Sequence, residues 1–125
     1  MAMSSGFSGM GGQRKSIPLV TVREAAARLA QSGAAVTLID VREPDEYVEV
    51  RAQGAVNIPL SQLARRSGEV PHDKDVLLIC HSGYRSMQAA LYLKRQGIER
   101  VSNVDGGTAE WENAGLPIVR GEVRP

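Results

Sequence analysis

The chain contains one cysteine, Cys80, and its position suits a nucleophile. Cys80 ends a continuous apolar run, Val76 to Cys80, that predicts a buried strand. In an open α/β sheet, ligands bind in the crevice beyond the carboxyl ends of the strands. The strand would therefore place the thiol at that edge, which makes Cys80 the first candidate for covalent chemistry.

A polar loop follows the cysteine directly and leads into a helix predicted over residues 86–96. Its residues are His81, Ser82, Gly83, Tyr84, Arg85 and Ser86. Successive backbone N–H groups in such a turn can converge on an anion, and the helix N-terminus adds about half a positive charge. Gly83 permits the backbone angles that a tight concave turn needs. We therefore expect an anion-binding loop around the sulfur.

Such a loop would make the thiol of Cys80 unusually acidic. Cysteines at helix N-termini or beside cations have pKa values of about 3.5 to 7.5, against about 8.5 for a free cysteine. Arg85 would add positive charge beside the sulfur, and His81 could either do the same or face solvent. The alternative is an inert cysteine, buried as a small apolar side chain. The junction between a strand and a helix favours the reactive form.

Three charged residues that follow the second predicted strand are candidates for loop support: Asp40, Arg42 and Glu46. They could line the pocket, but a salt-bridge network that fixes the loops is the favoured interpretation. For Arg85 the choice lies between contact with a substrate and a clamp on a carboxylate, and we favour the clamp. Backbone N–H groups then remain the main donors to the substrate.

Short apolar runs alternate with amphipathic segments along the chain. Strands are predicted at residues 17–20, 36–40, 56–58, 76–80 and 101–104, with helices from Thr21, Ser61 and Ser86 and a short last helix capped by Thr108. Thr21 and Glu24 form a capping box. This alternation, without hairpin turns, predicts an α/β fold: a central parallel sheet of about five strands with helices on both faces.

Length and composition limit the classes of function. The chain has 125 residues, enough for one domain, and we divide it into a flexible Gly/Ser-rich tail at residues 1–16 and a domain at residues 17–125. Its net charge of +1 gives no basic field for nucleic acid or a membrane surface. A membrane span needs about 20 consecutive apolar residues, and the sequence has no such run. We expect neither a nucleic-acid nor a membrane partner.

The single cysteine also limits the chemistry. It excludes an internal disulfide and the sulfur ligands of a structural zinc site. His72 lies in a predicted surface loop with no metal-binding pattern around it. A lone thiol suits a reducing compartment, and the N-terminal segment lacks the apolar run of a secretory signal. The predicted location is the cytoplasm.

The segment from Cys80 to Ser86 resembles the active-site loop of rhodanese-type sulfurtransferases. The resemblance extends over roughly residues 18–119, with the pieces in the order and spacing of the family. The other matching pieces are Leu38-Ile39-Asp40-Val41-Arg42-Glu43 followed by Glu46-Tyr47, Gly54-Ala55-Val56-Asn57-Ile58-Pro59-Leu60, Asp105-Gly106-Gly107, Trp111 and Gly115-Leu116-Pro117. Each piece alone is weak, but the combination is specific.

The resemblance implies a rhodanese-like domain and sulfur transfer without a metal or an organic cofactor. The thiolate of Cys80 would take the outer sulfur of a small donor such as thiosulfate and become a persulfide. Cyanide, a small thiol or a protein acceptor would then remove that sulfur. Tyr84 would project from the loop, where it can contact an acceptor.

Two other functions stay open. The domain could hold a persulfide or an anion for a partner protein, without turnover on small donors. A small phosphatase or arsenate reductase is less favoured, because those relatives have one more residue between the cysteine and the arginine, which widens the loop. Four residues lie between Cys80 and Arg85 here, and this spacing favours sulfur.

The chain departs from the family pattern at Val50-Arg51-Ala52-Gln53. The family usually carries Gly-His-Ile-Pro at this place, and its histidine usually supports packing and loops. We expect a changed pocket wall rather than lost chemistry. Arg51 could add positive charge near the site, but an exposed basic residue is the favoured interpretation. Trp111 is expected to pack in the core beneath the final helix.

Overall fold

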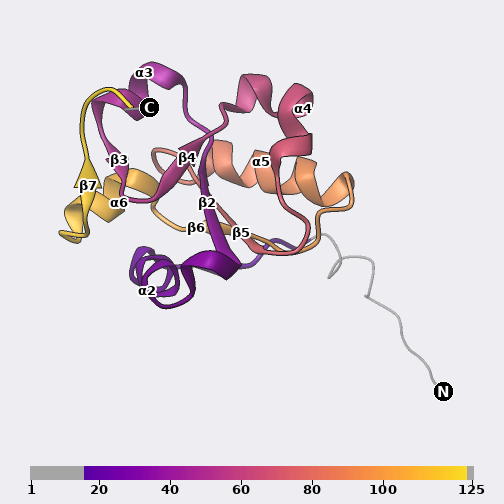
Figure 1. The fold of residues 1–125 in the computed structure, drawn as a ribbon, viewed down its shortest axis with the longest axis horizontal. Coiled ribbons are helices and arrows are strands. Elements are labelled where there is room, and N and C mark those ends of the chain that lie inside the picture. The colour runs from indigo at the N-terminus through magenta and orange to yellow at the C-terminus, as the bar shows by residue number, and fades with distance from the viewer. Residues whose placement is uncertain (1–15, 124–125) are drawn as a thin grey trace.

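A five-stranded parallel sheet forms the centre of the computed structural model, which describes residues 16–123 (Figure 1). Its strands are β1 (Leu19–Val20), β2 (Val36–Asp40), β4 (Ala55–Asn57), β5 (Asp75–Ile79) and β6 (Val101–Val104), in the order β1-β6-β5-β2-β4. The predicted α/β class with a parallel sheet of about five strands is confirmed. Residues 1–15 of the predicted tail lie outside the described residues.

Helices cover both faces of this sheet. They are α2 (Val22–Ser32), α3 (Pro44–Glu49), α4 (Leu63–Arg66), α5 (Tyr84–Arg95) and α6 (Gly107–Asn113), with short 3-10 turns η2 (Gly33–Ala35), η3 (Leu60–Gln62) and η4 (Ser67–Glu69). Side chains of α4 and α5 belong to one apolar cluster, which we call the α5-side cluster. Side chains of α2 and α6 belong to another, the α2-side cluster. None of the helices in residues 16–123 has the length and apolarity to cross a membrane.

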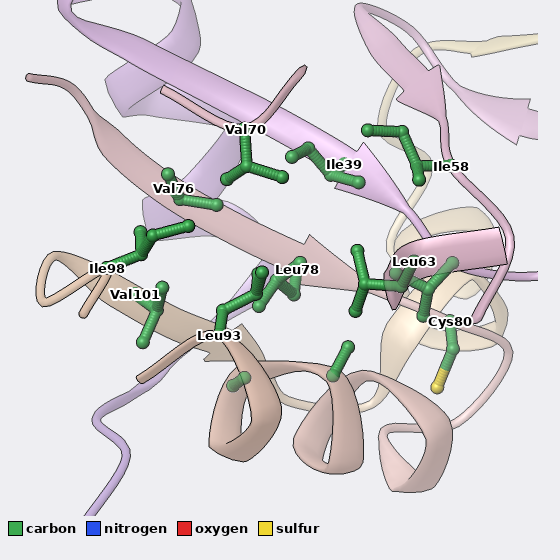
Figure 2. Close-up of a cluster of buried hydrophobic side chains, with 13 residues drawn as sticks. Ile39, Ile58, Leu63, Val70, Val76, Leu78, Cys80, Leu93, Ile98 and Val101 are labelled. Carbon is green, nitrogen blue, oxygen red and sulfur yellow. The ribbon is translucent and has the colours of Figure 1, made fainter. Parts of the chain in front are cut away.

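The side chains of β5 alternate between these two clusters, because successive residues of a strand point to opposite faces. Val76 and Leu78 lie in the α5-side cluster, and Leu77 and Ile79 lie in the α2-side cluster. Figure 2 shows the α5-side cluster, with Cys80 at its edge and the sulfur directed toward α5. The alternation that buries the strand therefore also turns the cysteine toward this helix.

The strand register brings three chain segments to one edge of the sheet. Asp40 at the end of β2 pairs with Ile79 at the end of β5, and Leu78 pairs with Asn103 of β6. Because these strands are parallel, the loops that follow them lie at the same edge. The loop that begins at Cys80 therefore lies beside the turn after β2 and beside Asn103.

Local boundaries differ from the sequence prediction near the cysteine. Strand β5 ends at Ile79, so Cys80 is the first residue of the loop, and α5 begins earlier than predicted, at Tyr84. The predicted cap of the last helix is wrong: Gly106 is the N-cap, and Thr108 lies inside α6. Thr108 instead donates its backbone N–H and its hydroxyl to the carbonyl of Cys80, at 2.8 and 3.1 Å.

Helix α3 and the antiparallel pair of β3 (Arg51–Ala52) and β7 (Ile118–Val119) were absent from the sequence prediction. Two-residue strands leave no periodic pattern in a sequence, and this pair joins distant segments. Two local predictions are confirmed. Thr21 and Glu24 form the reciprocal hydrogen bonds of a capping box, at 2.8 and 3.0 Å, and Trp111 is buried in the α2-side cluster.

Candidate active site

The first turn of α6 holds the loop after β5 from outside. The backbone N–H groups of Thr108 and Ala109 donate to the carbonyls of Cys80 and His81, at 2.8 and 3.0 Å respectively. Gly107 begins α6 with a φ of 62°, and a side chain there would collide with the same two carbonyls. The loop carbonyls therefore face α6, while N–H groups farther along the loop face the sulfur.

Hydrogen-bonding groups of Gly83 and Ser86 lie around the sulfur of Cys80. The backbone N–H groups of Gly83 and Ser86 donate to Sγ at 3.1 and 3.3 Å. The Ser86 hydroxyl lies 3.2 Å from Sγ, where either atom can donate. Gly83 has a φ of 115°, in the left-handed region that favours glycine, and it is the N-cap of α5. The loop amides therefore converge on the sulfur.

Burial and hydrogen bonding act on the Cys80 thiol in opposite directions. Only 1% of Cys80 is exposed, and this burial raises the pKa because a thiolate loses its solvation. Hydrogen bonds from the Ser86 side chain and from the N–H groups of Ser86, Gly83 and Ser82 outweigh burial, so the pKa of Cys80 lies below its ordinary value. The sulfur can therefore ionise although it is buried.

Arg85 forms a two-pronged ion pair with Glu46 of α3. Its terminal nitrogens donate to the two carboxylate oxygens at 2.7 and 2.9 Å. The Arg85 hydrogen bond is the main reason that the pKa of Glu46 is lowered from 4.5 to about 2. The guanidinium is thus engaged by a carboxylate, as the clamp interpretation predicted. The pair joins the first turn of α5 to α3.

A second ion pair, which is buried, holds the turn after β2. Arg42 donates to the Asp40 carboxylate from Nε at 3.0 Å and from Nη2 at 2.7 Å. Its Nη2 also donates to the carbonyl of Val50, just past α3, at 2.6 Å. Asn57 of β4 donates its amide to the carbonyls of Asp40 and Arg42. These contacts fix α3, which carries Glu46.

The other side chains of the loop face solvent. His81, Ser82 and Tyr84 are exposed, and 73% of Tyr84 is accessible. An incoming molecule can therefore contact these three side chains. Within residues 16–123, no three His, Cys, Asp or Glu side chains are grouped so that they could hold a metal ion.

Asn103 of β6 is a buried polar residue that sequence analysis missed. Its Oδ1 accepts the Ser86 hydroxyl at 2.5 Å, and its Nδ2 donates to the carbonyl of Gly83 at 3.1 Å. The available signal was an amide side chain within a predicted buried strand, because a buried polar group needs hydrogen-bond partners. Asn103 therefore connects β6 to both the loop and α5.

The expectation that Arg51 is exposed is wrong. Only 7% of the residue is accessible, and its guanidinium donates to the carbonyls of Tyr47 and Gly121, at 3.1 and 2.8 Å. It also lies 4.7 Å from the centroid of the Tyr47 ring. These partners replace water around the buried charge. Arg51, which lies in the segment that departs from the family pattern, thus joins α3 to the C-terminal segment.

The sequence is similar to a known family model and to known proteins. A family model described as a rhodanese-like domain matches residues 21–114. A sulfurtransferase from Allochromatium vinosum is 42% identical over 87 residues, which cover 70% of this chain and 81% of that protein. A Bacillus subtilis protein named "Putative sulfur carrier protein YrkF" is 38% identical over 96 residues, which cover 77% of this chain and 51% of that protein.

A comparison of structures gives the same result. The thiosulfate sulfurtransferase from Pseudomonas aeruginosa matches 93% of this chain with a TM-score of 0.77 and 25% sequence identity. The match covers 22% of that protein. The family model spans strands β2, β4, β5 and β6 of the sheet, the flanking helices and the whole loop from Cys80 to Ser86. The chain therefore belongs to the rhodanese-like domain family.

Proposed function

We propose that this protein is a sulfurtransferase that carries a sulfane sulfur on Cys80 as a persulfide. The donor would be thiosulfate or a similar small anion, and the acceptor would be cyanide or a thiol, a protein thiol included. The observation that supports this proposal most directly is the convergence of the Gly83 and Ser86 N–H groups on Sγ. A cysteine buried only for packing would not need these donors.

The first step is attack of the Cys80 thiolate on the outer sulfur of the donor. The electron pair of the thiolate forms a new S–S bond of about 2.05 Å. The S–S bond of thiosulfate breaks, and its electron pair leaves on sulfite. The negative charge passes from Sγ to the outer sulfur of the persulfide. The lowered pKa of Cys80 supports this step, because the thiolate is the nucleophile.

Backbone donors, rather than an unpaired side-chain cation, would hold the anionic donor. Arg85 is already paired with Glu46, so the two side chains together add little net charge. The loop N–H groups and the N-terminus of α5 offer partial positive charge without a counterion. The exposed side chains of His81, Ser82 and Tyr84 would border the bound donor and contact the acceptor.

The second step returns Cys80 to its resting form. The nucleophile of the acceptor attacks the outer sulfur, the persulfide bond breaks, and its electron pair returns to Sγ. Cyanide leaves as thiocyanate, and a thiol leaves as a persulfide. Hydrogen bonds that stabilise the thiolate also make it a better leaving group. A cytoplasmic location would keep the single cysteine reduced and is part of this proposal.

Intact-protein mass spectrometry before and after thiosulfate treatment tests the persulfide. We expect the native protein to gain the mass of one sulfur atom and Cys80→Ser to gain none. An assay of thiocyanate formation from thiosulfate and cyanide should show turnover that Cys80→Ser abolishes. Equal activity or an equal sulfur gain in the serine variant would overturn the proposal.

A sulfur carrier is the second candidate function. The name of the Bacillus subtilis relative and the 1% exposure of Cys80 favour it. A carrier would accept a sulfur but release it only to a matching protein partner. Normal persulfide formation together with negligible thiocyanate formation would identify a carrier, whereas rapid thiocyanate formation would exclude this second candidate.

A further inference from the structure

A chain of buried polar groups continues behind Cys80, from the Ser86 hydroxyl to Asn103. Ser86 is fully buried, and only 3% of Asn103 is exposed. Two atoms near the Ser86 hydroxyl can accept its hydrogen bond: Sγ of Cys80 at 3.2 Å and Oδ1 of Asn103 at 2.5 Å. A hydroxyl has a single proton, so full donation to one atom excludes full donation to the other.

The second contact of Asn103 determines how its amide is oriented. The far end of the amide lies 3.1 Å from the Gly83 carbonyl, which can only accept a hydrogen bond. The NH₂ group must therefore face Gly83, and the amide oxygen must face Ser86. Because an amide oxygen cannot donate, Ser86 is the donor in the 2.5 Å contact.

We propose that Asn103 is a positioning residue that competes with Cys80 for the hydroxyl proton of Ser86. When Cys80 is a thiol, its S–H donates to Ser86 Oγ, and the Ser86 hydroxyl donates to Asn103. When Cys80 is a thiolate, the hydroxyl turns to Sγ, and the oxygen of Asn103 loses this donor. The inference rests on the proposed function, because it concerns the sulfur proposed as the nucleophile.

This competition favours the states in which Sγ carries no charge. Sulfur transfer from thiosulfate moves the negative charge from Sγ to the outer sulfur, and the electron pair of the broken bond leaves on sulfite. The Ser86 hydroxyl can then return to Asn103. Asn103 therefore opposes the thiolate and supports the persulfide, whereas the N–H groups of Gly83 and Ser86 support the thiolate.

The loop and the elements at this edge of the sheet carry the same charged residues whether or not Asn103 is changed. They are Asp40 and Arg42 after β2, Glu46 on α3, Arg85 on α5, Asp105 after β6, Glu110 on α6 and the neighbouring His81. Among them, Arg85 interacts electrostatically with Cys80 while it is paired with Glu46. A comparison of variants at Asn103 therefore leaves these charges in place and changes only the two hydrogen bonds of the Asn103 amide, to Ser86 and to Gly83.

The test measures the pKa of Cys80 from the pH dependence of its alkylation by iodoacetamide, in Asn103→Leu and in the native chain. The chain has one cysteine, so the signal has a single source. Without the amide oxygen, the Ser86 hydroxyl donates its hydrogen bond to the thiolate instead. This bond stabilises the thiolate, and we expect the pKa of Cys80 to fall by about 0.5 to 1 unit. A residue that only held the loop would give a rise, because a loosened loop loses its N–H donors.

Ser86→Ala is the matched control. That variant has no hydroxyl to compete for, so Asn103→Leu should not lower the pKa of Cys80 in its background. If circular dichroism shows that Asn103→Leu is unfolded, the smaller Asn103→Ala replaces it, with the same expected fall. A rise or no change in the folded Asn103 variant, or a fall that persists without the hydroxyl, overturns the inference.

Failure of this inference and failure of the proposed function are distinguishable. The alkylation experiment requires no sulfur donor or acceptor, so its result does not depend on sulfur transfer. A fall in the pKa without any persulfide formation would support the role of Asn103 and overturn sulfur transfer. Persulfide formation with an unchanged pKa in Asn103→Leu would support sulfur transfer and overturn the role of Asn103.

Discussion

At the scale of single residues, the sulfur of Cys80 is subject to two opposing effects. Burial disfavours the thiolate, and hydrogen bonds to Sγ favour it. The hydrogen bonds outweigh burial because a helix N-terminus and the turn before it direct N–H groups at one atom. Arg85 is not needed as a direct partner of the sulfur, since its guanidinium binds Glu46.

We expect alkylation of Cys80 by iodoacetamide to reach half its maximal rate at a lower pH in the native protein than in the urea-unfolded chain. The thiolate is the reacting form, and folding lowers the pKa of the thiol from its ordinary value. The ionised sulfur therefore stabilises the fold above the unfolded pKa, and this contribution is lost as the pH falls through the folded pKa.

The midpoint of the pH profile is the measurement, because burial also slows alkylation at every pH. A small thiol such as N-acetylcysteine, titrated in the same buffers, provides the reference. An equal or higher midpoint in the native protein would contradict the opposing-effects account of Cys80.

At the scale of secondary-structure elements, the position of the loop depends on α6 as much as on α5. The first turn of α6 donates to the carbonyls of Cys80 and His81, and the first turn of α5 donates to the sulfur through Ser86. The backbone of the loop is thus held between two helix N-termini. This arrangement requires a close approach of α6, which a glycine at position 107 allows.

Gly107→Ala should move the loop carbonyls, whereas Gly115→Ala should not. Both glycines have positive φ angles, 62° and 75°, but an added methyl group meets backbone only at Gly107. Backbone strain costs about 1 to 3 kcal/mol at either position, and overpacking adds about 1 to 3 kcal/mol at Gly107.

Urea denaturation of the two glycine variants measures this difference in stability. Alkylation as a function of pH should also show a raised pKa of Cys80 in Gly107→Ala alone, because the displaced loop loses its hydrogen bonds to sulfur. Equal losses of stability and equal pKa values in the two variants would mean that α6 does not hold the loop.

At the scale of the whole molecule, the parallel sheet assembles a site from segments that are far apart in the sequence. The register of β2, β5 and β6 brings Asp40, Cys80 and Asn103 to one edge. The pair of Glu46 and Arg85 then joins two of these segments across 39 positions of the chain. Site geometry and global stability therefore share some of the same contacts.

The ion pair of Glu46 and Arg85 should make stability depend on pH in acid. The pKa of Glu46 is lowered from 4.5 to about 2, so the pair stabilises the fold above pH 4.5 and this stabilisation is lost as the pH falls toward 2. The whole shift corresponds to roughly 3 kcal/mol. Solvent screening of this one-third-exposed pair reduces the expected contribution to about 1 kcal/mol.

Urea denaturation of Glu46→Gln and of the native chain, repeated from pH 7 down to pH 2, measures this contribution. The difference in unfolding free energy should shrink as the pH falls. Glu69→Gln is the control, because Glu69 forms an exposed pair with nearby Arg66 on the surface, and we expect no measurable change. A difference for Glu46→Gln that is independent of pH would contradict the predicted ion-pair contribution.

Local patterns in the sequence account for the predictions that succeeded. The apolar run before Cys80 and the polar loop after it mark a buried strand that ends at a helix, and the confirmed parallel sheet follows from strands that alternate with amphipathic helices. The capping box of Thr21 and Glu24 is also local, since its partners are one helical turn apart. Such features depend on neighbours along the chain, which a sequence displays directly.

The sequence alone therefore determined the fold class and which residue is the candidate nucleophile. Only the tertiary structure decided that Arg85 binds Glu46, that Arg51 is buried, that Thr108 holds the carbonyl of Cys80 and that Asn103 reaches Ser86. Each of these four facts depends on partners separated by many residues along the chain. A polar side chain binds whatever donor or acceptor the packed sheet brings near it, and that neighbour is set by strand order and register rather than by local spacing.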